Sequence, residues 1–208
     1  MSYNLEKWHS RLSERIDLTA SVVHLTKATD DMNISAVVAK ILSEKRLIGS
    51  TTNSGFICGK TPAVCFQDAP IYSISQNVYY EQKSQEPTNG GKVRYSPAGF
   101  VFKKDFIFAK GGRPVIYEKR ETAKKLLPKN EYWRIVNFDL TNQNEIIDWT
   151  HEREWRVPGD LEFEYSDLRL FINKPESIRL VRKYLEEKIK IDIFDELGGI
   201  ICATDILR

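Results

Sequence analysis

The chain has few cysteines, no long apolar run and no recognisable export signal. Its three cysteines, Cys58, Cys65 and Cys202, are odd in number and follow no paired ligand spacing, so neither a disulfide framework nor a zinc site is expected. No stretch approaches the roughly 18 apolar residues of a membrane-spanning helix. The opening residues MSYNLEKW lack the apolar segment of a signal peptide. We therefore expect a soluble cytoplasmic protein that holds no metal ion and contacts no membrane.

Glycine-rich phosphate loops and a strong excess of one charge are also missing. Neither GxxxxGK(S/T) nor GxGxxG occurs, so ATP-driven or hydride-transfer chemistry is not expected. The 31 Lys and Arg residues nearly balance 29 Asp and Glu, giving a net charge of +2, and 41% of residues are hydrophobic. This composition excludes an acidic disordered chain and does not by itself indicate a nucleic-acid-binding domain.

The positive charge is nevertheless concentrated in one segment, residues 103–129. Nine basic and three acidic residues give this segment a net charge of +6. Two interpretations stay open: a solvated surface of alternating Lys and Glu, or a face that meets a phosphate backbone.

The hydrophobic pattern predicts one α+β domain over residues 1–208, without repeats or a linker. Helical spacing is expected over 3–18, 34–42 and 175–188, with one or two helical turns at 121–127. Short β-branched or aromatic runs predict strands at 21–26, 63–66, 100–102, 106–108, 114–117, 133–140, 154–157, 167–172 and 198–203. Residues 81–97 are rich in Pro, Gly and polar residues, a composition typical of a mobile loop.

The densest group of chemically capable residues is the segment DWTHEREWRV, residues 148–157. If residues 152–157 are extended, Glu152, Glu154 and Arg156 share one face, while Trp155 and Val157 point to the other and can enter the core. The three charged residues fit a surface ion-pair ladder. They also fit a cleft-rim site where a carboxylate binds a ribose hydroxyl and stabilises developing positive charge, as glycosidase carboxylates do.

His24 is the second candidate, because it stands with Thr26 at the end of the first expected strand. A histidine there is often a satisfied structural residue. Its position just before a loop that opens a helix also suits contacts with ribose or phosphate groups.

Several short motifs, in their order along the chain, resemble known families. The segment His24–Thr26, followed by the helix through Ile41 and Leu42 and by Arg46–Ile48, resembles the opening of ADP-ribosyltransferases of the DarT toxin type. The segments VCFQDAP, GFVFKK, RPVIY and EREWR, starting at residues 64, 99, 113 and 152, resemble AbiGi-like bacterial abortive phage-infection proteins. The resemblance covers roughly residues 20–160, and the order of the motifs is more specific than any one of them.

The resemblance implies an ADP-ribosyltransferase-like fold: N-terminal helices and a split pair of small antiparallel or mixed sheets, with NAD in a cleft between the sheets. It matches Glu154 to the catalytic carboxylate and Glu152 to the first carboxylate of a Glu-x-Glu pair. His24 and Thr26 match NAD-contacting residues. The remaining NAD-binding candidates are a stacking tyrosine (Tyr72, Tyr79 or Tyr80) and an arginine (Arg46 or Arg113).

Three functions are compatible with these residues and motifs. The first is NAD-dependent ADP-ribosyl transfer, in a toxin or phage-defence setting, to a nucleic acid or protein, with a variant that transfers to water. The second is a non-catalytic binding module or antitoxin-like partner on the same fold; a neutralising partner protein is a further candidate ligand. The third is a metal-dependent nuclease resting on Asp139, Asp148, Glu152 and Glu154, which lacks the lysine expected beside such carboxylates.

Overall fold

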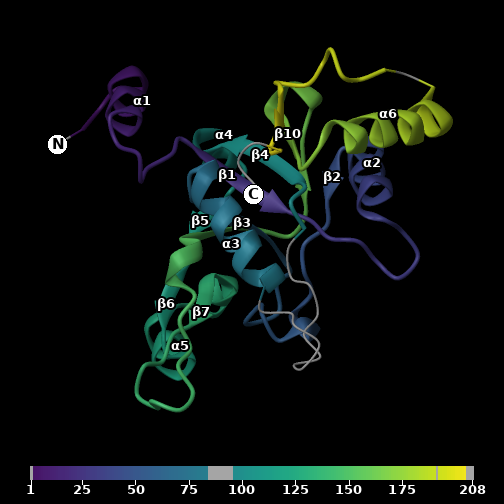
Figure 1. The fold of residues 1–208 in the computed structure, drawn as a ribbon. Coiled ribbons are helices and arrows are strands. Elements are labelled where there is room, and N and C mark those ends of the chain that lie inside the picture. Colours follow the sequence, from purple (N-terminus) through teal and green to yellow (C-terminus); the bar gives the residue numbers. More distant parts are fainter. Residues whose placement is uncertain (1, 84–95, 191, 205–208) are drawn as a thin grey trace. The chain divides into compact units, whose positions relative to one another are not determined.

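A computed structural model describes residues 2–83, 96–190 and 192–204 and shows an α+β chain (Figure 1). It divides into two compact units: residues 1–46, 69–103 and 163–208 form unit 1, and residues 47–68 and 104–162 form unit 2. Of the loop expected at 81–97, residues 84–95 lie outside the described residues. Among the described helices, none has the length and apolar character needed to cross a membrane.

Unit 1 is built on four neighbouring strands in the order β11-β10-β4-β1. The β4 strand pairs antiparallel with both β1 and β10, and β10 pairs parallel with β11. The strands are β1 (Ser21–Leu25), β4 (Gly99–Lys103), β10 (Leu168–Ile172) and β11 (Ile200–Cys202), and the helices are α1 (Leu5–Ser13), α2 (Ile34–Glu44), α3 (Ile71–Lys83) and α6 (Pro175–Ile189), with the single turn η4 (Tyr165–Asp167).

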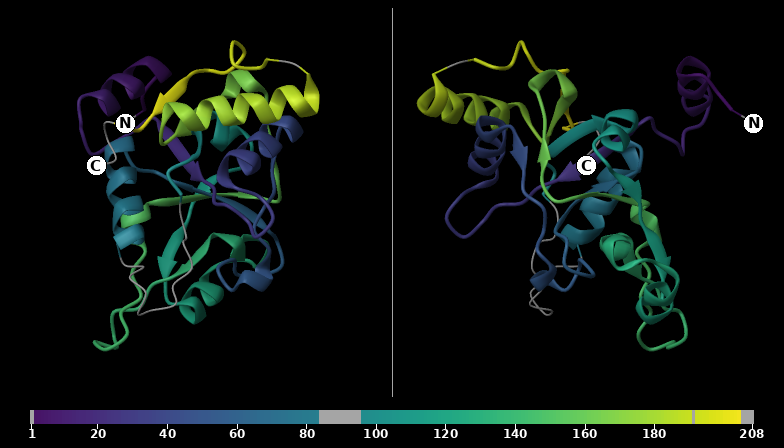
Figure 2. Two further views of the ribbon diagram at one scale, coloured as in Figure 1. Left: turned by 45° about the vertical axis from the view of Figure 1, so that its right-hand side comes forward. Right: turned by 180° about the vertical axis from the view of Figure 1, so that it is seen from behind.

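Helices cover both faces of these four strands. Ile74 and Val78 of α3 pack on the face that carries Val23, Val101 and Phe171. On the opposite face, α2 and α6 lie side by side (Figure 2), and residues of both helices line a small pocket together with Ile172 of β10. The α2 helix begins where the Asn33 side chain accepts a hydrogen bond from the Ala36 N–H, the cap that its sequence favours.

The β4 strand needs a glycine where it meets β1. A Cβ atom on Gly99 would lie 1.9 Å from the carbonyl oxygen of His24. The two backbones therefore approach too closely for any side chain at this position.

Unit 2 has a second strand group in the order β3-β8-β5, with β8 paired antiparallel on both sides. A separate parallel pair joins β6 to β7. The strands are β3 (Ala63–Gln67), β5 (Arg113–Pro114), β6 (Ile116–Glu118), β7 (Ile135–Asn137), β8 (Glu154–Pro158) and β9 (Leu161–Glu162), and β2 (Arg46–Leu47) straddles the boundary between the units. The helices are α4 (Lys104–Ala109) and α5 (Arg120–Leu126), with the short 3-10 helices η1 (Thr52–Ser54), η2 (Lys129–Arg134) and η3 (Thr150–Glu152).

Several expectations about elements are wrong. The run Phe106–Phe108 was expected as a strand but lies in α4, where Ile107 alone of the three is buried and Phe108 is exposed. A three-residue apolar run cannot distinguish strand from helix by period. The first helix ends at Ser13 and not at residue 18, and Ile16 is 98% exposed.

The third concerns residues 133–140, which are extended only at β7 because the 3-10 turn η2 continues to Arg134. The α3 helix was not expected at all, although Ile71, Ile74 and Val78 carry helical spacing on its packed face.

Candidate functional site

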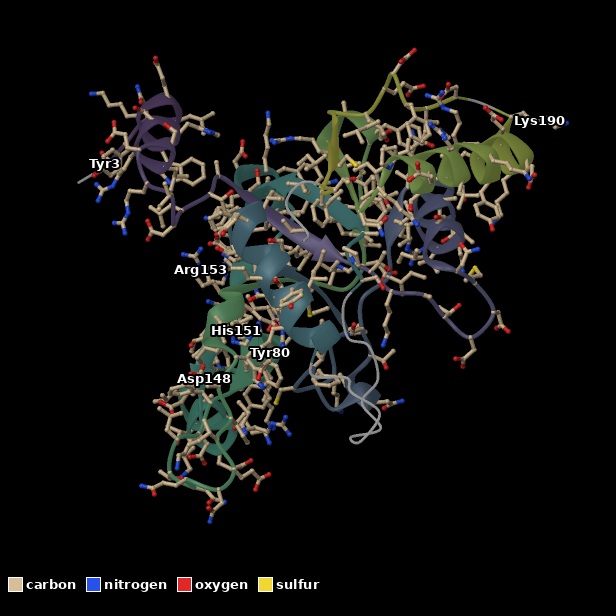
Figure 3. The ribbon with its side chains drawn as sticks, in the orientation of Figure 1. Tyr3, Tyr80, Asp148, His151, Arg153 and Lys190 are labelled. Atoms are coloured by element: carbon tan, nitrogen blue, oxygen red, sulfur yellow. The ribbon has the colours of Figure 1, made fainter. Side chains whose placement is uncertain are left out.

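The carboxylate-rich segment enters β8 through a sharp backbone change. Residues 150–152 form the turn η3, Arg153 adopts a left-handed conformation with φ 44°, and the strand begins only at Glu154. The expectation that residues 152–157 are all extended is therefore wrong, because Glu152 belongs to the turn. Figure 3 marks Asp148, His151 and Arg153 along this approach to the strand.

The turn is fixed by hydrogen bonds at both of its ends. At its start, the Asp148 carboxylate accepts bonds from the N–H and hydroxyl of Thr150 at 2.8 and 2.7 Å, and the hydroxyl bond is the main cause that lowers the pKa of Asp148. At its end, the N–H of Asp68, just past β3, donates to the carbonyls of Glu152 and Arg153 at 3.2 and 3.3 Å. The position of Glu154 is thus set by the backbone.

The Asp68 side chain, at the end of β3, contacts residues of both α4 and β8. One oxygen lies 2.8 Å from the ammonium nitrogen of Lys104 at the start of α4. The other accepts the indole N–H of Trp155 at 3.2 Å. Of the two β8 residues expected to enter the core, Val157 is buried, whereas Trp155 is half-buried and bound to Asp68.

Glu154 and Arg156 form a buried, two-point ion pair. Nε of Arg156 donates to Oε1 at 2.7 Å, and Nη2 donates to Oε2 at 3.1 Å. Their side chains are only 8% and 4% exposed. The expected sharing of one strand face is correct for these two residues, but the pair lies inside unit 2 and is not a surface ladder.

Tyr117 and Cys65 complete the surroundings of Glu154. The N–H of Glu154 donates to the Tyr117 hydroxyl at 2.7 Å. Burial, with added repulsion from Glu154 and Glu152, raises the pKa of Tyr117. Burial followed by the charge of Glu154 also raises the pKa of the Cys65 thiol well above its usual value. Both groups therefore stay protonated, and Glu152, itself buried, adds a second carboxylate to this cluster.

The other expected site residues lie in unit 1, apart from Arg113. His24 and Phe100 are paired across β1 and β4, so His24 projects to the face opposite the one covered by α3. Tyr72 and Tyr80 lie on the outer side of α3 and are 67% and 71% exposed. Within this unit, the structure does not bring His24 and the two tyrosines together.

The last two candidates in unit 1 are Thr26 and Arg46. The Thr26 N–H donates to the carbonyl of Ala98 at 3.0 Å, and Arg46 is exposed on β2. In unit 2, the Arg113 guanidinium lies 3.8 Å over the ring of Phe108 and donates to the Phe108 and Gly112 carbonyls. That arginine closes the C-terminal end of α4.

The sequence pattern found Glu152, Glu154 and Arg156 but not the contacts from distant segments. Asp68 and Tyr117 both stand inside motifs noted above, QDAP and PVIY, although neither was given a role. The structure supplies those roles as hydrogen-bond partners of the turn and of β8.

The described residues contain no group of three or more His, Cys, Asp and Glu side chains arranged to bind a metal ion. Asp139, Asp148, Glu152 and Glu154 therefore do not form the cluster on which a nuclease would depend.

Comparison of the chain with known protein families, with curated proteins and with solved structures finds no match. The similarity to ADP-ribosyltransferases and abortive-infection proteins thus rests on the sequence motifs alone.

Proposed function

We propose that this chain is an NAD-dependent ADP-ribosyltransferase of a toxin or phage-defence type, acting on a nucleic acid or protein. The proposal includes the finer fold class, an ADP-ribosyltransferase-like arrangement of small sheets. The observation that carries it is the Glu154 carboxylate, held at the first residue of β8 by Arg156 and accompanied by the buried Glu152.

The chemistry supplied by NAD is a nicotinamide–ribose bond whose electron pair leaves with nicotinamide while the acceptor atom attacks the same ribose carbon and loses its proton. Glu154 suits this reaction because a carboxylate has about four lone-pair positions and Arg156 occupies one on each oxygen. The Cys65 thiol also hydrogen-bonds to this carboxylate, and in the proposal a further lone pair accepts a ribose hydroxyl. A fixed negative charge stabilises positive charge that develops on the ribose without reorganisation.

The remaining NAD contacts of this proposal rest on the sequence resemblance alone. In the proposal, His24 and Thr26 hold ribose or phosphate groups, one of Tyr72, Tyr79 and Tyr80 stacks on nicotinamide, and Arg46 is the candidate arginine.

The test is release of nicotinamide from NAD by the purified chain, with and without nucleic acid or cell extract. Glu154→Gln keeps the shape of the side chain and removes its charge, so release should fall by about 10²-fold or more. Glu162→Gln, on the exposed position of β9, is the matched control and should release nicotinamide at the wild-type rate. Equal rates for the wild type and a folded Glu154→Gln protein would contradict the proposal.

One observation favours a second candidate, a non-catalytic binding module or antitoxin-like partner. Both oxygens of Glu154 already accept hydrogen bonds, and its side chain is 8% exposed, as in a purely structural ion pair. A wild-type chain that neither binds NAD nor releases nicotinamide, alone or with cell extract, would favour this candidate.

A further inference from the structure

The Arg156 guanidinium has a complete set of acceptors. Beyond its two bonds to Glu154, Nη1 donates to the carbonyls of Trp133 and Ile135 at 2.8 and 3.3 Å, and Nη2 donates to the carbonyl of Phe56 at 3.4 Å. A guanidinium carries five N–H donors, and five acceptors surround this one. Its plane is therefore fixed by three backbone carbonyls from two chain segments, together with the Glu154 side chain.

That fixed plane determines where the Glu154 carboxylate points. The two residues lie on one face of β8, and the two parallel N–H···O bonds require both planar groups to stay nearly coplanar. With 8% of the Glu154 side chain exposed, water cannot easily replace these bonds. The carboxylate thus has one orientation before any ligand arrives.

We propose that Arg156 is the positioning residue of Glu154: it aims the carboxylate at the reacting ribose and contacts no substrate itself. This inference rests on the proposed function of Glu154. Arg156 is 3% exposed, so its contribution reaches the reaction only through the carboxylate.

A lysine cannot fill this role. Its ammonium group keeps the charge but offers three donors from a single point, without the planar fork that grips both carboxylate oxygens. Arg156→Lys therefore retains a charged partner for Glu154, which protects the fold, and removes the orientation. A carboxylate misplaced by about 1 Å costs on the order of 10²-fold in rate.

The experiment measures steady-state nicotinamide release for the wild type, Arg156→Lys, Glu154→Gln and the double variant. We expect kcat of Arg156→Lys to fall by about 10²-fold with KM within about twofold, because only the chemical step uses the orientation. In the Glu154→Gln background the same change should have almost no further effect, since the residue that Arg156 aims is already disabled.

Arg134→Lys is the matched control. Arg134 pairs with Glu131 at 3.2 Å and donates to a backbone carbonyl in the same unit, but it is more exposed. Its lysine variant should keep wild-type kcat and KM. Thermal unfolding of each variant shows whether the folded fraction is unchanged.

The outcomes separate the two proposals. A wild-type chain without activity overturns both the function and the positioning role. An active wild type with a fully active Arg156→Lys variant overturns the positioning role alone. A rate loss that is equally large in the Glu154→Gln background, or that follows the unfolded fraction, assigns Arg156 a structural role instead.

Discussion

The ammonium nitrogen of Lys104 lies 2.8 Å from an oxygen of Asp68, with side chains only 10% and 18% exposed. A lysine so little exposed to water requires a nearby negative charge. This pair fastens the start of α4 to the end of β3, directly beside the turn that carries Glu152.

Asp68→Asn should therefore destabilise the chain. The amide oxygen can still accept the Trp155 indole N–H, so the substitution isolates the loss of charge. Removing one partner of a buried pair leaves the other uncompensated, and we expect the free energy of unfolding to fall by about 3 kcal/mol. Urea unfolding measures this loss. Glu164→Gln, in the exposed pair with Lys45, is the control and should change stability far less, because solvent screens an exposed pair; equal losses would refute the assignment.

Thiol reactivity should differ sharply among the three cysteines. Cys202 is exposed, Cys58 is buried, and the pKa of Cys65 is raised by burial and by Glu154. Because the thiolate is the reactive form, a disulfide reagent at neutral pH should modify one cysteine rapidly. Cys202→Ser should abolish that fast phase, and denaturant should expose the remaining thiols. A fast phase that persists in Cys202→Ser would show that the thiol of Cys65 or Cys58 is accessible.

The lowered pKa of Asp139 predicts how the stability of the chain depends on pH. Hydrogen bonds from Thr141, then the bond from Lys119, lower the pKa of Asp139 from 3.8 to about 2. A lowered folded-state pKa gives stability that is complete above the unfolded value and is lost as pH falls through the folded value. The stability difference between wild type and Asp139→Asn should be constant above about pH 5 and shrink between about pH 4 and 2. Urea unfolding at several pH values measures it; a difference that grows on acidification would reverse the sign.

The basic segment, residues 103–129, allows a test of whether the acceptor is a nucleic acid. Lys125 and Lys129 are exposed and, within the described part of the chain, enter no ion pair, so Lys125→Gln/Lys129→Gln changes charge alone. If the acceptor is a nucleic acid bound here, the double variant should bind it more weakly, and the slope of affinity against salt should flatten by about two. Lys183→Gln/Lys188→Gln on α6 carries the same charge change and should bind normally. Identical salt slopes for all three proteins would remove this segment from acceptor binding.

Local sequence signals were sufficient for the helices and strands with a clear hydrophobic period. The α2 helix begins at Ile34, as the expected span 34–42 predicted, and α6 starts at Pro175 with Val181 and Leu185 buried. The strands at Ser21–Leu25 and Ala63–Gln67 were expected within a residue of their observed ends. The α4 helix was not predicted, because a β-forming run became helical in the tertiary setting of Ile107.

The site was only half predictable for a similar reason. The Glu-x-Glu pattern is local, but the groups that hold it come from distant segments: Tyr117 is 37 residues from Glu154, and Asp68 is 87 residues from Trp155. Nor could a two-residue period reveal that Arg153 is left-handed and leaves Glu152 outside the strand.

The double pairing of β8, between β3 and β5, restricts how this part of the chain can change in length. Adding or deleting one residue within Glu154–Pro158 would shift the register by one and exchange the faces of the strand. Glu154 and Arg156 would then exchange sides with Trp155, and both the ion pair and the Asp68 contact would be lost together. Length changes between residues 141 and 146, which are exposed, meet no such penalty, so insertions and deletions should be tolerated there and excluded from β8.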